Sequence, residues 1–428
     1  MKTAIFTICS RNYLAYALTL QKSVRAAEPD KSFFIYLADE LPDEGMALEA
    51  NIVPARALGL DNFLDMAFRY TVMEFNTAIK ADCFLDLLTR RGFDAAIYLD
   101  PDIRVFSPLT EVHKALETGA SIVLTPHILA PSPKGTFPDE AEILKSGVFN
   151  LGFGAFAGTE ESLAFINWWA TKLHAECYSA PEKGLFVDQR FVDLAPCFIE
   201  HLAILRHPGY NVAYWNIAGR HVERWADGIH VNGAPLVFFH FSGVQPGNPD
   251  LFSKHLGGRV TKPGETVRRL VRDYLGELAD AGHNKWSAIP YAYGHFRDGS
   301  EILAPMRRAV PSSGSAEDWF EAPHITWWNK ADPEIDQEGG VAITRLMSGI
   351  HSMRPDLQAA FPLAASSGRR GYHAWFCRHG AAEYCVPNVF LDPKKIGSVR
   401  FSQRYLTPGL KRLKASISNG KRGQHKDA

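Results

Sequence analysis

The first 40 residues constrain the fold of this chain most, because two patterns of apolar side chains alternate in them. Residues 3–8 (TAIFTI) and 33–40 (FFIYLADE) contain short apolar runs that are typical of buried strands. Between them, residues 13–30 carry apolar side chains at helical spacing, with Asn12 as the expected N-cap and Pro29 near the end. A strand–helix–strand order predicts a parallel sheet whose ligand crevice lies at the carboxyl ends of its strands.

Three more apolar runs predict further strands, at residues 95–99, 122–125 and 236–240. Residues 159–177 predict a helix whose aromatic side chains we interpret as core. The chain is therefore predicted to be an α/β protein with helices flanking a sheet. No internal repeat is evident.

The strand predicted at residues 95–99 is followed by Asp100, Pro101 and Asp102. Proline ends a strand because it has no N–H for the ladder, so both aspartates are expected at the carboxyl end. Residues two apart in an extended segment point to the same side, where two carboxylates can hold a cation. Asp and Pro are also common in turns, and these residues alone leave both interpretations open.

The composition of the 428 residues excludes some classes of protein. With 46% apolar residues and a formal net charge of -1, the chain is neither disordered nor generally nucleic-acid-binding. The six cysteines show no metal-ligand spacing and are interpreted as free thiols in a reducing compartment. The apolar run before Arg11 is too short for a signal peptide, and no run reaches the roughly 20 apolar residues of a membrane span. These features predict a cytoplasmic protein.

The pattern changes after Pro249, which predicts a domain at residues 1–255 and a mainly helical C-terminal region at 256–428. Residues 310–319 resemble a linker, and helices are expected at 339–353 and 371–386. The basic tail is either a solvated segment or a contact with the anionic surface of a membrane.

Four other stretches carry residues that are typical of ligand sites. They contain Asn12 with Tyr13, Asn150, Asp188 with Gln189, and His240. An aromatic ring after a strand can stack on a base, whereas a buried Asn serves either a ligand or a turn. The Asp-Gln pair either contacts a ligand or caps a helix. A single strand-end His is more often structural, but beside two aspartates it favours a metal site.

In this order, the stretches resemble the catalytic domain of retaining GT-A glycosyltransferases of the family-8 type, which includes bacterial lipopolysaccharide galactosyltransferases and glycogenin. The resemblance spans about residues 3–247. It rests on Asn12-Tyr13, the Tyr-Leu-Asp-x-Asp ending at Asp102, the Phe-Asn-x-Gly from Phe149, Asp188-Gln189, and the His-x-x-Gly from His240. It implies a GT-A fold, which is a Rossmann-like mixed sheet that binds a nucleotide sugar.

The resemblance also implies roles for single residues. Asp100, Asp102 and His240 would hold Mn²⁺ (or Mg²⁺) at the diphosphate of a nucleotide sugar, which in this family is usually UDP-linked. Asn12 and Tyr13 would hold its nucleoside, and Lys80 and Asn150 would face the donor. Asp188 would accept hydrogen bonds from the hydroxyls of the sugar, and Gln189 would lie near its anomeric carbon. Two carboxylates and an imidazole suit manganese better than calcium.

One position departs from the family pattern. Pro246 stands where the family commonly has a lysine that neutralises the leaving diphosphate. Another cation would have to replace it, and the sequence does not rank the four candidates. They are Lys80, Arg11, Arg190 and Lys254.

The resulting hypothesis is a metal-dependent glycosyltransferase that moves a sugar to a hydroxyl of a cell-envelope glycan, a lipid-linked glycan or a related acceptor, with retention of anomeric configuration. Inversion stays open, because the same scaffold also hosts inverting enzymes. A sugar nucleotidyltransferase is disfavoured, since residues 7–16 (TICSRNYLAY) lack a glycine-rich phosphate loop. A non-catalytic sugar-binding or assembly protein on this fold is the third alternative, and Pro246 is its best support.

Overall fold

The computed structural model describes residues 1–41, 51–257, 259, 263–310, 319–320, 325–335, 341–387 and 390. The chain divides into two compact units, residues 1–294 and 295–428. The predicted division near residue 255 falls inside the first unit. Helix α10 (Glu265–Asp280) belongs to that unit, because its apolar face shares a core with Phe239 and Phe241.

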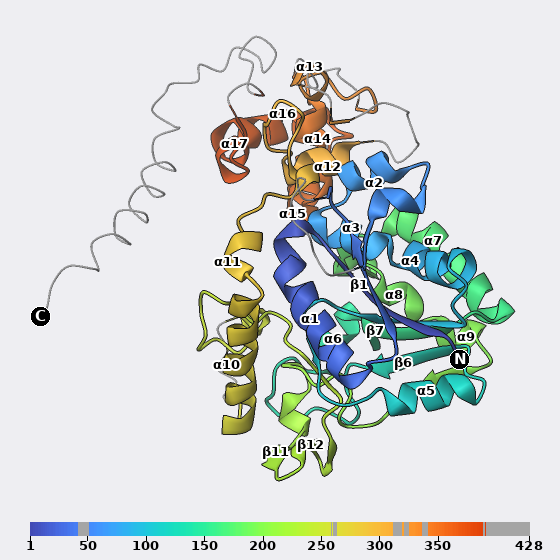
Figure 1. The fold of residues 1–428 in the computed structure, drawn as a ribbon. Helices are drawn as coiled ribbons and strands as arrows, with labels where there is room; N and C mark the ends of the chain where they lie inside the picture. Colours follow the sequence, from blue (N-terminus) through green and yellow to red (C-terminus); the bar gives the residue numbers. More distant parts are fainter. Residues whose placement is uncertain are drawn as a thin grey trace, which may run out of the picture. The chain divides into compact units, whose positions relative to one another are not determined.

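A seven-stranded mixed sheet forms the centre of the first unit (Figure 1). Its strands, in spatial order, are β10 (Leu202–Ile204), β6 (Ile122–Pro126), β7 (Phe149–Ala157), β4 (Ala95–Leu99), β1 (Thr3–Cys9), β2 (Ser32–Leu37) and β3 (Asn51–Pro54). All neighbours pair in parallel except β7, which runs antiparallel to both β4 and β6. The α/β prediction is therefore confirmed, and the predicted strands at 95–99 and 122–125 both occur.

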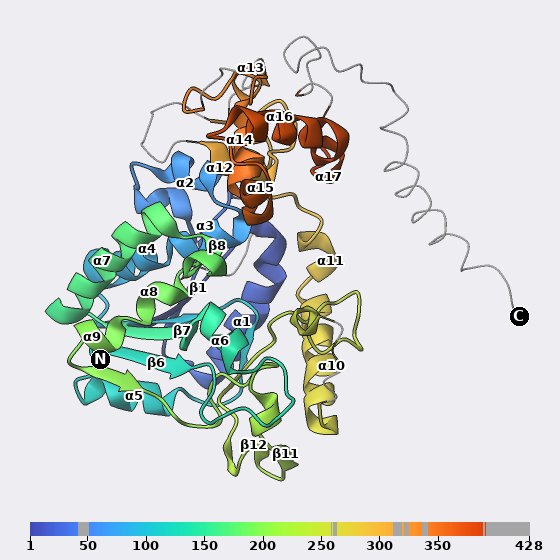
Figure 2. The same ribbon diagram turned by 180° about the vertical axis from the view of Figure 1, so that it is seen from behind.

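Helices cover both faces of this sheet (Figures 1 and 2). Neighbouring side chains of β1 contact helices on opposite faces. Ile5 faces a core that it shares with α1 (Leu14–Ala27) and α5 (Thr110–Glu117). Phe6 points to the other face, where its ring lies 4.8 Å from that of Phe84 in α4 (Lys80–Leu85). On the same face, Trp169 of α7 (Glu160–Glu176) stacks on Phe156 at 5.9 Å. The aromatic face predicted for α7 is core.

The remaining helices and strands of this unit each span seven residues or fewer. They are α2 (Phe63–Arg69), α3 (Val72–Ala78), β5 (Ile103–Val105), α6 (Glu140–Ser146), β8 (Ser179–Ala180), β9 (Leu185–Phe186), α8 (Gln189–Val192), α9 (Ala195–Phe198), β11 (Val222–Trp225), β12 (Gly228–Val231), β13 (Ala234–Pro235), β14 (Phe238–His240) and α11 (His283–Trp286). The strand expected at residues 236–240 is shortened to β14, which pairs with β5 outside the main sheet and also bridges to Val212.

The start of α1 differs from the prediction. A 3₁₀ turn, Arg11–Tyr13, lies between β1 and the helix, so Tyr13 and not Asn12 occupies the N-cap position. The prediction of Asn12 as the N-cap was wrong, because this extra turn starts the helix later. The Asn12 side chain instead accepts a hydrogen bond from Ser10 Oγ at 2.5 Å.

The second unit is helical where the structure describes it. Its helices are α12 (Ala304–Ala309), α13 (Ile325–Trp328), α14 (Arg345–Ser352), α15 (Pro355–Ala360), α16 (Ser366–Trp375) and α17 (Ala381–Glu383). The helices predicted at 339–353 and 371–386 correspond to α14 and to α16 with α17. Most of the predicted linker and the basic tail lie outside the described residues.

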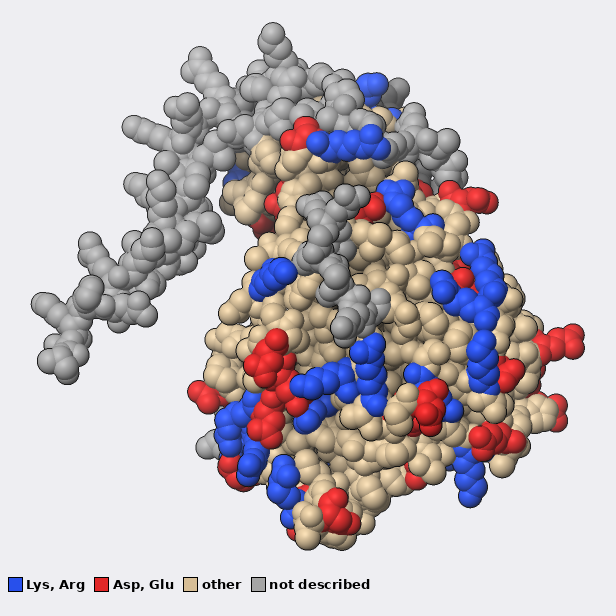
Figure 3. All heavy atoms as spheres, in the orientation of Figure 1, with Lys and Arg blue, Asp and Glu red and all other residues tan. Residues whose placement is uncertain are grey.

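Two surface properties bear on the cellular setting. None of the helices in the described ranges has the length and apolarity that crossing a bilayer requires. On the face drawn in Figure 3, acidic and basic side chains are interspersed, and neither sign covers a broad area. That distribution agrees with the near-zero net charge.

Candidate functional site

Three of the predicted site residues lie at one edge of the main sheet. Asp100 and Asp102 follow β4, and Asn150 lies at the start of β7, which begins beside the end of β4 because the two are antiparallel. The Asp100 amide donates to the Gly152 carbonyl at 2.8 Å, and the Ile103 amide donates back to the Asp100 carbonyl at 3.0 Å. A backbone turn therefore does form here. It uses main-chain groups and leaves both carboxylates available.

His240 joins the two aspartates through the β5–β14 ladder. In this ladder His240 pairs with Ile103, and the Phe241 amide donates to the Asp102 carbonyl at 2.9 Å. His240 Nε2 lies 3.0 Å from Asp102 Oδ1 and 3.5 Å from Asp100 Oδ2. One ligand atom from each of the three lies within 4.8 Å of the others. We call these three residues the acidic triad.

The exposure and charge of the acidic triad suit a divalent cation. The His240 side chain is only 4% exposed, whereas those of Asp100 and Asp102 are 29% and 21% exposed, so the set opens toward solvent through its carboxylates. Burial by itself raises the pKa of Asp102, but the His240 imidazole outweighs it and the net shift is downward. Burial lowers the pKa of His240, and the carboxylates reverse that shift. Two carboxylate oxygens and one imidazole nitrogen are a ligand set that can hold a divalent cation.

Gly152 makes room for the imidazole of the acidic triad. A Cβ at position 152 would lie 2.4 Å from His240 Cε1 and 2.8 Å from Asn150 Oδ1, much closer than atoms pack. The Gly152 amide also donates to Asn150 Oδ1 at 3.2 Å. The Phe-Asn-x-Gly pattern thus has a physical reason in this chain. The Asn150 side chain accepts a hydrogen bond from the Gly152 amide, and the absence of a side chain at Gly152 leaves space for the His240 ring.

Lys80 and Asp188 form a buried ion pair connected to the acidic triad. Lys80 Nζ donates to Asp188 Oδ2 at 2.5 Å and to the Leu151 carbonyl at 2.8 Å, and both charged side chains are 2% exposed. Burial raises the pKa of Asp188, and Lys80 offsets only part of that rise. The Lys80 ammonium lies 4.0 Å from the centre of the Tyr98 ring, whose hydroxyl donates to Asp100 Oδ1 at 2.6 Å. Lys80 is therefore not a solvated surface lysine.

The Gln189 side chain is bonded at both ends of its amide. Its Oε1 accepts from Asn150 Nδ2 at 3.1 Å and from the Leu151 amide at 2.9 Å, and its Nε2 donates to the Ser146 carbonyl at 3.0 Å. Asp188 occupies the N-cap position of α8 but makes no side-chain cap bond. The cap interpretation of this pair therefore does not hold.

Sequence reasoning missed a buried polar network behind Asn150. Asn211 Nδ2 donates to Asn150 Oδ1 and to Thr125 Oγ1, each at 3.1 Å, while Asn150 Nδ2 lies 3.2 Å from His127 Nε2. Asn216 Nδ2 donates to the His127 carbonyl at 2.9 Å. Burial lowers the pKa of His127 to about 4, so its imidazole is neutral near pH 7. The available signal was positional, since Thr125 and His127 follow an apolar run just as Asp100 does.

Tyr13 lies on the crevice side of the first turn. It is 39% exposed and stacks on Tyr16 with ring centres 4.6 Å apart. Burial and the charge of Asp102 both raise the pKa of Tyr13, so the phenol is close enough to the acidic triad to sense it. Asn12, which precedes Tyr13, is half-buried.

The structure ranks the cations expected to replace the missing lysine at Pro246. Three of them are held by carboxylates: Lys80 by Asp188, Arg11 by Asp39 at 3.3 Å, and Arg190 by Asp193 at 2.7 Å. Lys254 is exposed, and within the described part of the chain no carboxylate pairs with it. After burial, its charge is the next cause of the lowered pKa of His255, which also senses Asp102. Among the four candidates, Lys254 is thus the one that no carboxylate of the described residues pairs with.

The comparison with protein families finds no matching family model. Two curated proteins of Bacillus subtilis (strain 168) are similar in sequence. "Uncharacterized protein YfnF" is 27% identical over 255 residues, which cover 57% of this chain and 82% of that protein. "Uncharacterized protein YfnD" is 27% identical over 148 residues, which cover 34% of this chain and 45% of that protein. Their descriptions assign no activity.

Glycosyltransferases are among the solved structures that this chain resembles. The galactosyltransferase LgtC, in complex with donor and acceptor sugar analogs, has a TM-score of 0.40 and 18% identity, and the match covers 64% of this chain and 95% of that chain. The glycosyltransferase GlyE of Streptococcus pneumoniae TIGR4 has a TM-score of 0.37 and 14% identity, covering 69% and 67%. With TM-scores below 0.5, these likenesses do not by themselves assign an activity.

Proposed function

We propose that this protein is a metal-dependent glycosyltransferase of the GT-A type, whose catalytic residues lie in the first unit. The observation that carries the proposal is the acidic triad, in which Asp100, Asp102 and His240 converge beyond the end of β4 although His240 is 138 residues from Asp102 in the numbering. Ligands of this mixed type at the carboxyl edge of an α/β sheet are typical of a site for a metal and a phosphorylated ligand.

The acidic triad would hold Mn²⁺ or Mg²⁺. When bound, the cation neutralises charge on the diphosphate of the donor and acts as a Lewis acid. The Tyr98 hydroxyl, bonded to Asp100 Oδ1, fixes the orientation of that carboxylate. Gly152 keeps space for the His240 ring, so both groups position ligands without touching the donor.

The nucleoside of the donor, which we expect to be uridine, would lie against Asn12 and Tyr13. The exposed Tyr13 ring offers a stacking surface, and the Asn12 amide offers polar contacts. Lys254 would approach the leaving diphosphate in place of the lysine that Pro246 replaces, since its ammonium is free for a new anion.

The donor sugar would lie between the acidic triad and α8. The second oxygen of Asp188 would accept hydrogen bonds from sugar hydroxyls, while Lys80 holds the first. Gln189 would lie near the anomeric carbon and stabilise positive charge there. An amide is a poor nucleophile, so we favour a front-face route with retention, in which the departing phosphate oxygen takes the proton of the acceptor hydroxyl.

The acceptor would be a cell-envelope glycan or a related hydroxyl. We expect the mainly helical region after residue 255 to serve acceptor binding or assembly, and the basic tail is the part that would contact a membrane. Neither proposal alters the chemistry assigned to the acidic triad.

The test measures UDP binding by calorimetry, with and without Mn²⁺. UDP should bind with Mn²⁺ present, and Asp100→Ala or Asp102→Ala should weaken that binding by about 100-fold or more. Asp61→Ala removes an exposed carboxylate of the same unit and should change nothing. Unchanged affinity in both triad variants would overturn the metal role.

A second measurement separates transfer from the alternative functions. The wild-type protein with Mn²⁺ should release UDP slowly from one UDP-sugar of a panel, and NMR of the glycoside formed with an added alcohol acceptor should show the anomeric configuration of the donor. Binding without any release would indicate a non-catalytic sugar-binding protein. Pyrophosphate formed from a nucleoside triphosphate and a sugar phosphate would indicate a nucleotidyltransferase.

A further inference from the structure

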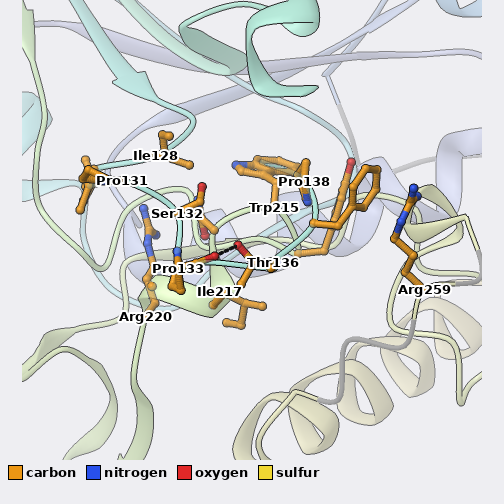
Figure 4. Close-up of a pocket in the computed structure, with 18 of the residues that line it drawn as sticks. Ile128, Pro131, Ser132, Pro133, Thr136, Pro138, Trp215, Ile217, Arg220 and Arg259 are labelled. Carbon is orange, nitrogen blue, oxygen red and sulfur yellow. Dashed lines mark hydrogen bonds between the residues drawn. The ribbon is translucent and has the colours of Figure 1, made fainter. Parts of the chain in front are cut away.

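Figure 4 shows a cavity of about 620 Å³ in the first unit. Residues 128–133 and 135–138 form one wall and residues 214–220 the other, with Asn232 and Arg259 completing the lining. The cavity is connected to the acidic triad through Trp215, which lines it and contacts His240. The volume is in the range of small-molecule sites, roughly 300–1,000 Å³. None of the functions assigned above uses this cavity.

Trp215 separates the cavity from the acidic triad. Its indole packs edge-on against the His240 ring at 5.1 Å and against the His127 ring at 5.5 Å, and it also lines the cavity. The indole N–H is buried and has no hydrogen-bond partner in the described part of the chain. A buried indole N–H normally finds a partner, so this one is a free donor beside the cavity.

Arg220 brings a buried positive charge to the cavity wall. Only 9% of the residue is exposed, and its Nη1 donates to the Tyr210 carbonyl at 2.7 Å. Among the described residues no carboxylate pairs with Arg220, and the cavity lining contains none. Burial alone lowers the pKa of Arg220 to about 9, which reflects how poorly the protein solvates this charge.

A buried guanidinium without a counter-ion is costly, because burial removes its hydration and the hydrogen bond to the Tyr210 carbonyl replaces only part of it. Buried charges in proteins are normally paired. An anion entering the cavity would supply the missing partner, and the planar guanidinium suits a two-point contact with a carboxylate or a phosphate.

A second arginine lies at the opposite end of the cavity, as Figure 4 shows. Arg259 lies over the ring of Phe137, 3.9 Å from its centre. The lining combines apolar side chains, among them Ile128 and Ile217, with polar ones such as Thr136. Such a wall can cover the apolar face of a sugar ring while the ends bind its charged substituents.

We propose that this cavity is the acceptor site and that it selects an acceptor sugar carrying an anionic group, a carboxylate or a phosphate, which Arg220 binds. The assignment as an acceptor site rests on the proposed function. The binding of an anionic sugar does not, so it can be tested without donor or metal.

The test measures binding of three probes by calorimetry without Mn²⁺ or nucleotide. The probes are methyl glucuronide, methyl glucoside 6-phosphate and neutral methyl glucoside. At least one charged probe should bind about tenfold or more tighter than the neutral probe, and which one does so identifies the anion. Arg220→Gln should abolish that preference, whereas Arg206→Gln, which removes an exposed arginine, should keep it. Equal binding of charged and neutral probes would overturn the proposal.

A conservative variant and further binding measurements make the result interpretable. If Arg220→Gln does not fold, Arg220→Lys keeps the charge but loses the fork, and it should reduce the preference by several-fold. Binding of UDP with Mn²⁺ should be unchanged in both variants, since Arg220 is assigned to the acceptor alone. A charged probe that binds while UDP does not would separate failure of the proposed function from failure of this inference. The indole signal of Trp215 should shift with the preferred probe, and no shift would place that probe elsewhere.

Discussion

Two sets of ionisable side chains lie close together near the same sheet edge, and they differ in what completes them. The Lys80–Asp188 pair is buried, 2% exposed on both sides, and joined at 2.5 Å. The acidic triad contains two carboxylates that are 21–29% exposed, and both lie near the single imidazole of His240. The two charges of the first set therefore balance each other, whereas the second set has two carboxylates for one imidazole.

The difference shows why carboxylates alone do not identify a ligand site. Asp188 has its counter-charge in Lys80, so its burial is a matter of stability as well as of function. The imidazole of His240 compensates only part of the negative charge of Asp100 and Asp102, and both side chains are partly exposed to solvent. If this contrast is correct, removing Lys80 should damage the fold, and changes at the acidic triad should damage ligand binding.

The largest effect is expected for Lys80→Ala. The variant leaves the Asp188 carboxylate buried without its partner, which should lower the free energy of unfolding by about 3–5 kcal/mol. Urea denaturation followed by tryptophan fluorescence measures it. The double variant Lys80→Met with Asp188→Leu removes both charges and should recover most of the loss. A fully stable Lys80→Ala would mean that the pair is not buried as described.

Gly152→Ala should reduce both the stability of the fold and the affinity for Mn²⁺. The new Cβ would lie 2.4 Å from His240 Cε1, so the imidazole has to move. We expect a loss of about 1–3 kcal/mol in stability and a fall of roughly 10–100-fold in Mn²⁺ affinity. Gly158→Ala is the matched control in the same segment, because its Cβ would lie an ordinary 3.5 Å from the Asp94 carbonyl. Equal effects of the two substitutions would remove the special role of Gly152.

Sequence reasoning predicted the aspartates of the acidic triad better than the Lys80–Asp188 pair, for a physical reason. Pro101 ends β4, so the position of Asp100 and Asp102 follows from local chemistry that a single segment displays. The contact of Lys80 with Asp188 joins residues 108 apart, and no local pattern encodes it. Neighbouring aspartates beyond a strand are visible in a sequence, whereas a buried ion pair depends on how α4 packs against the rest of the unit.

The polar network shows the same limit. Asn211 adopts a left-handed backbone conformation, φ +50°, that lets its amide reach Asn150 and Thr125. Asn tolerates this conformation better than most residues, but its position in the chain gives no sign of the partners. Half of the candidate site, the half built by tertiary contacts, was therefore outside the reach of sequence reasoning.

His240→Ala should weaken Mn²⁺ binding on the order of tenfold, about 1.4 kcal/mol, and so less than loss of either aspartate. A neutral imidazole contributes less charge attraction than a carboxylate. Calorimetry with Mn²⁺ and UDP measures the affinity. His221→Ala is the control, since its side chain is 76% exposed and pairs only with Glu223. A variant that loses stability but keeps full Mn²⁺ affinity would make His240 a core residue.

The smallest effect concerns a carboxylate–histidine pair away from the acidic triad. Glu28 accepts from the Leu109 amide at 2.6 Å and lies 3.2 Å from His113 Nε2, and its side chain is 8% exposed. Burial alone raises the pKa of Glu28, but these two partners and Lys31 bring it below its ordinary value of 4.5. Glu28 thus differs from Asp102, because a backbone N–H binds its carboxylate and no cation is needed.

A carboxylate with a lowered folded pKa stabilises the fold above the unfolded pKa, and that contribution is lost as the pH falls through the folded value. For Glu28 the full contribution should be present above about pH 4.5 and disappear below it. Glu28→Gln should lower the free energy of unfolding by about 1–2 kcal/mol at pH 7, and the wild-type and variant urea curves should converge as the pH falls below 4.5. Mn²⁺ should leave this difference unchanged, because the pair needs no cation. A difference in the free energy of unfolding that persists undiminished at pH 3, or that depends on Mn²⁺, would contradict this account. It would mean that carboxylates paired within the protein, such as Glu28, do not differ from carboxylates that bind a ligand.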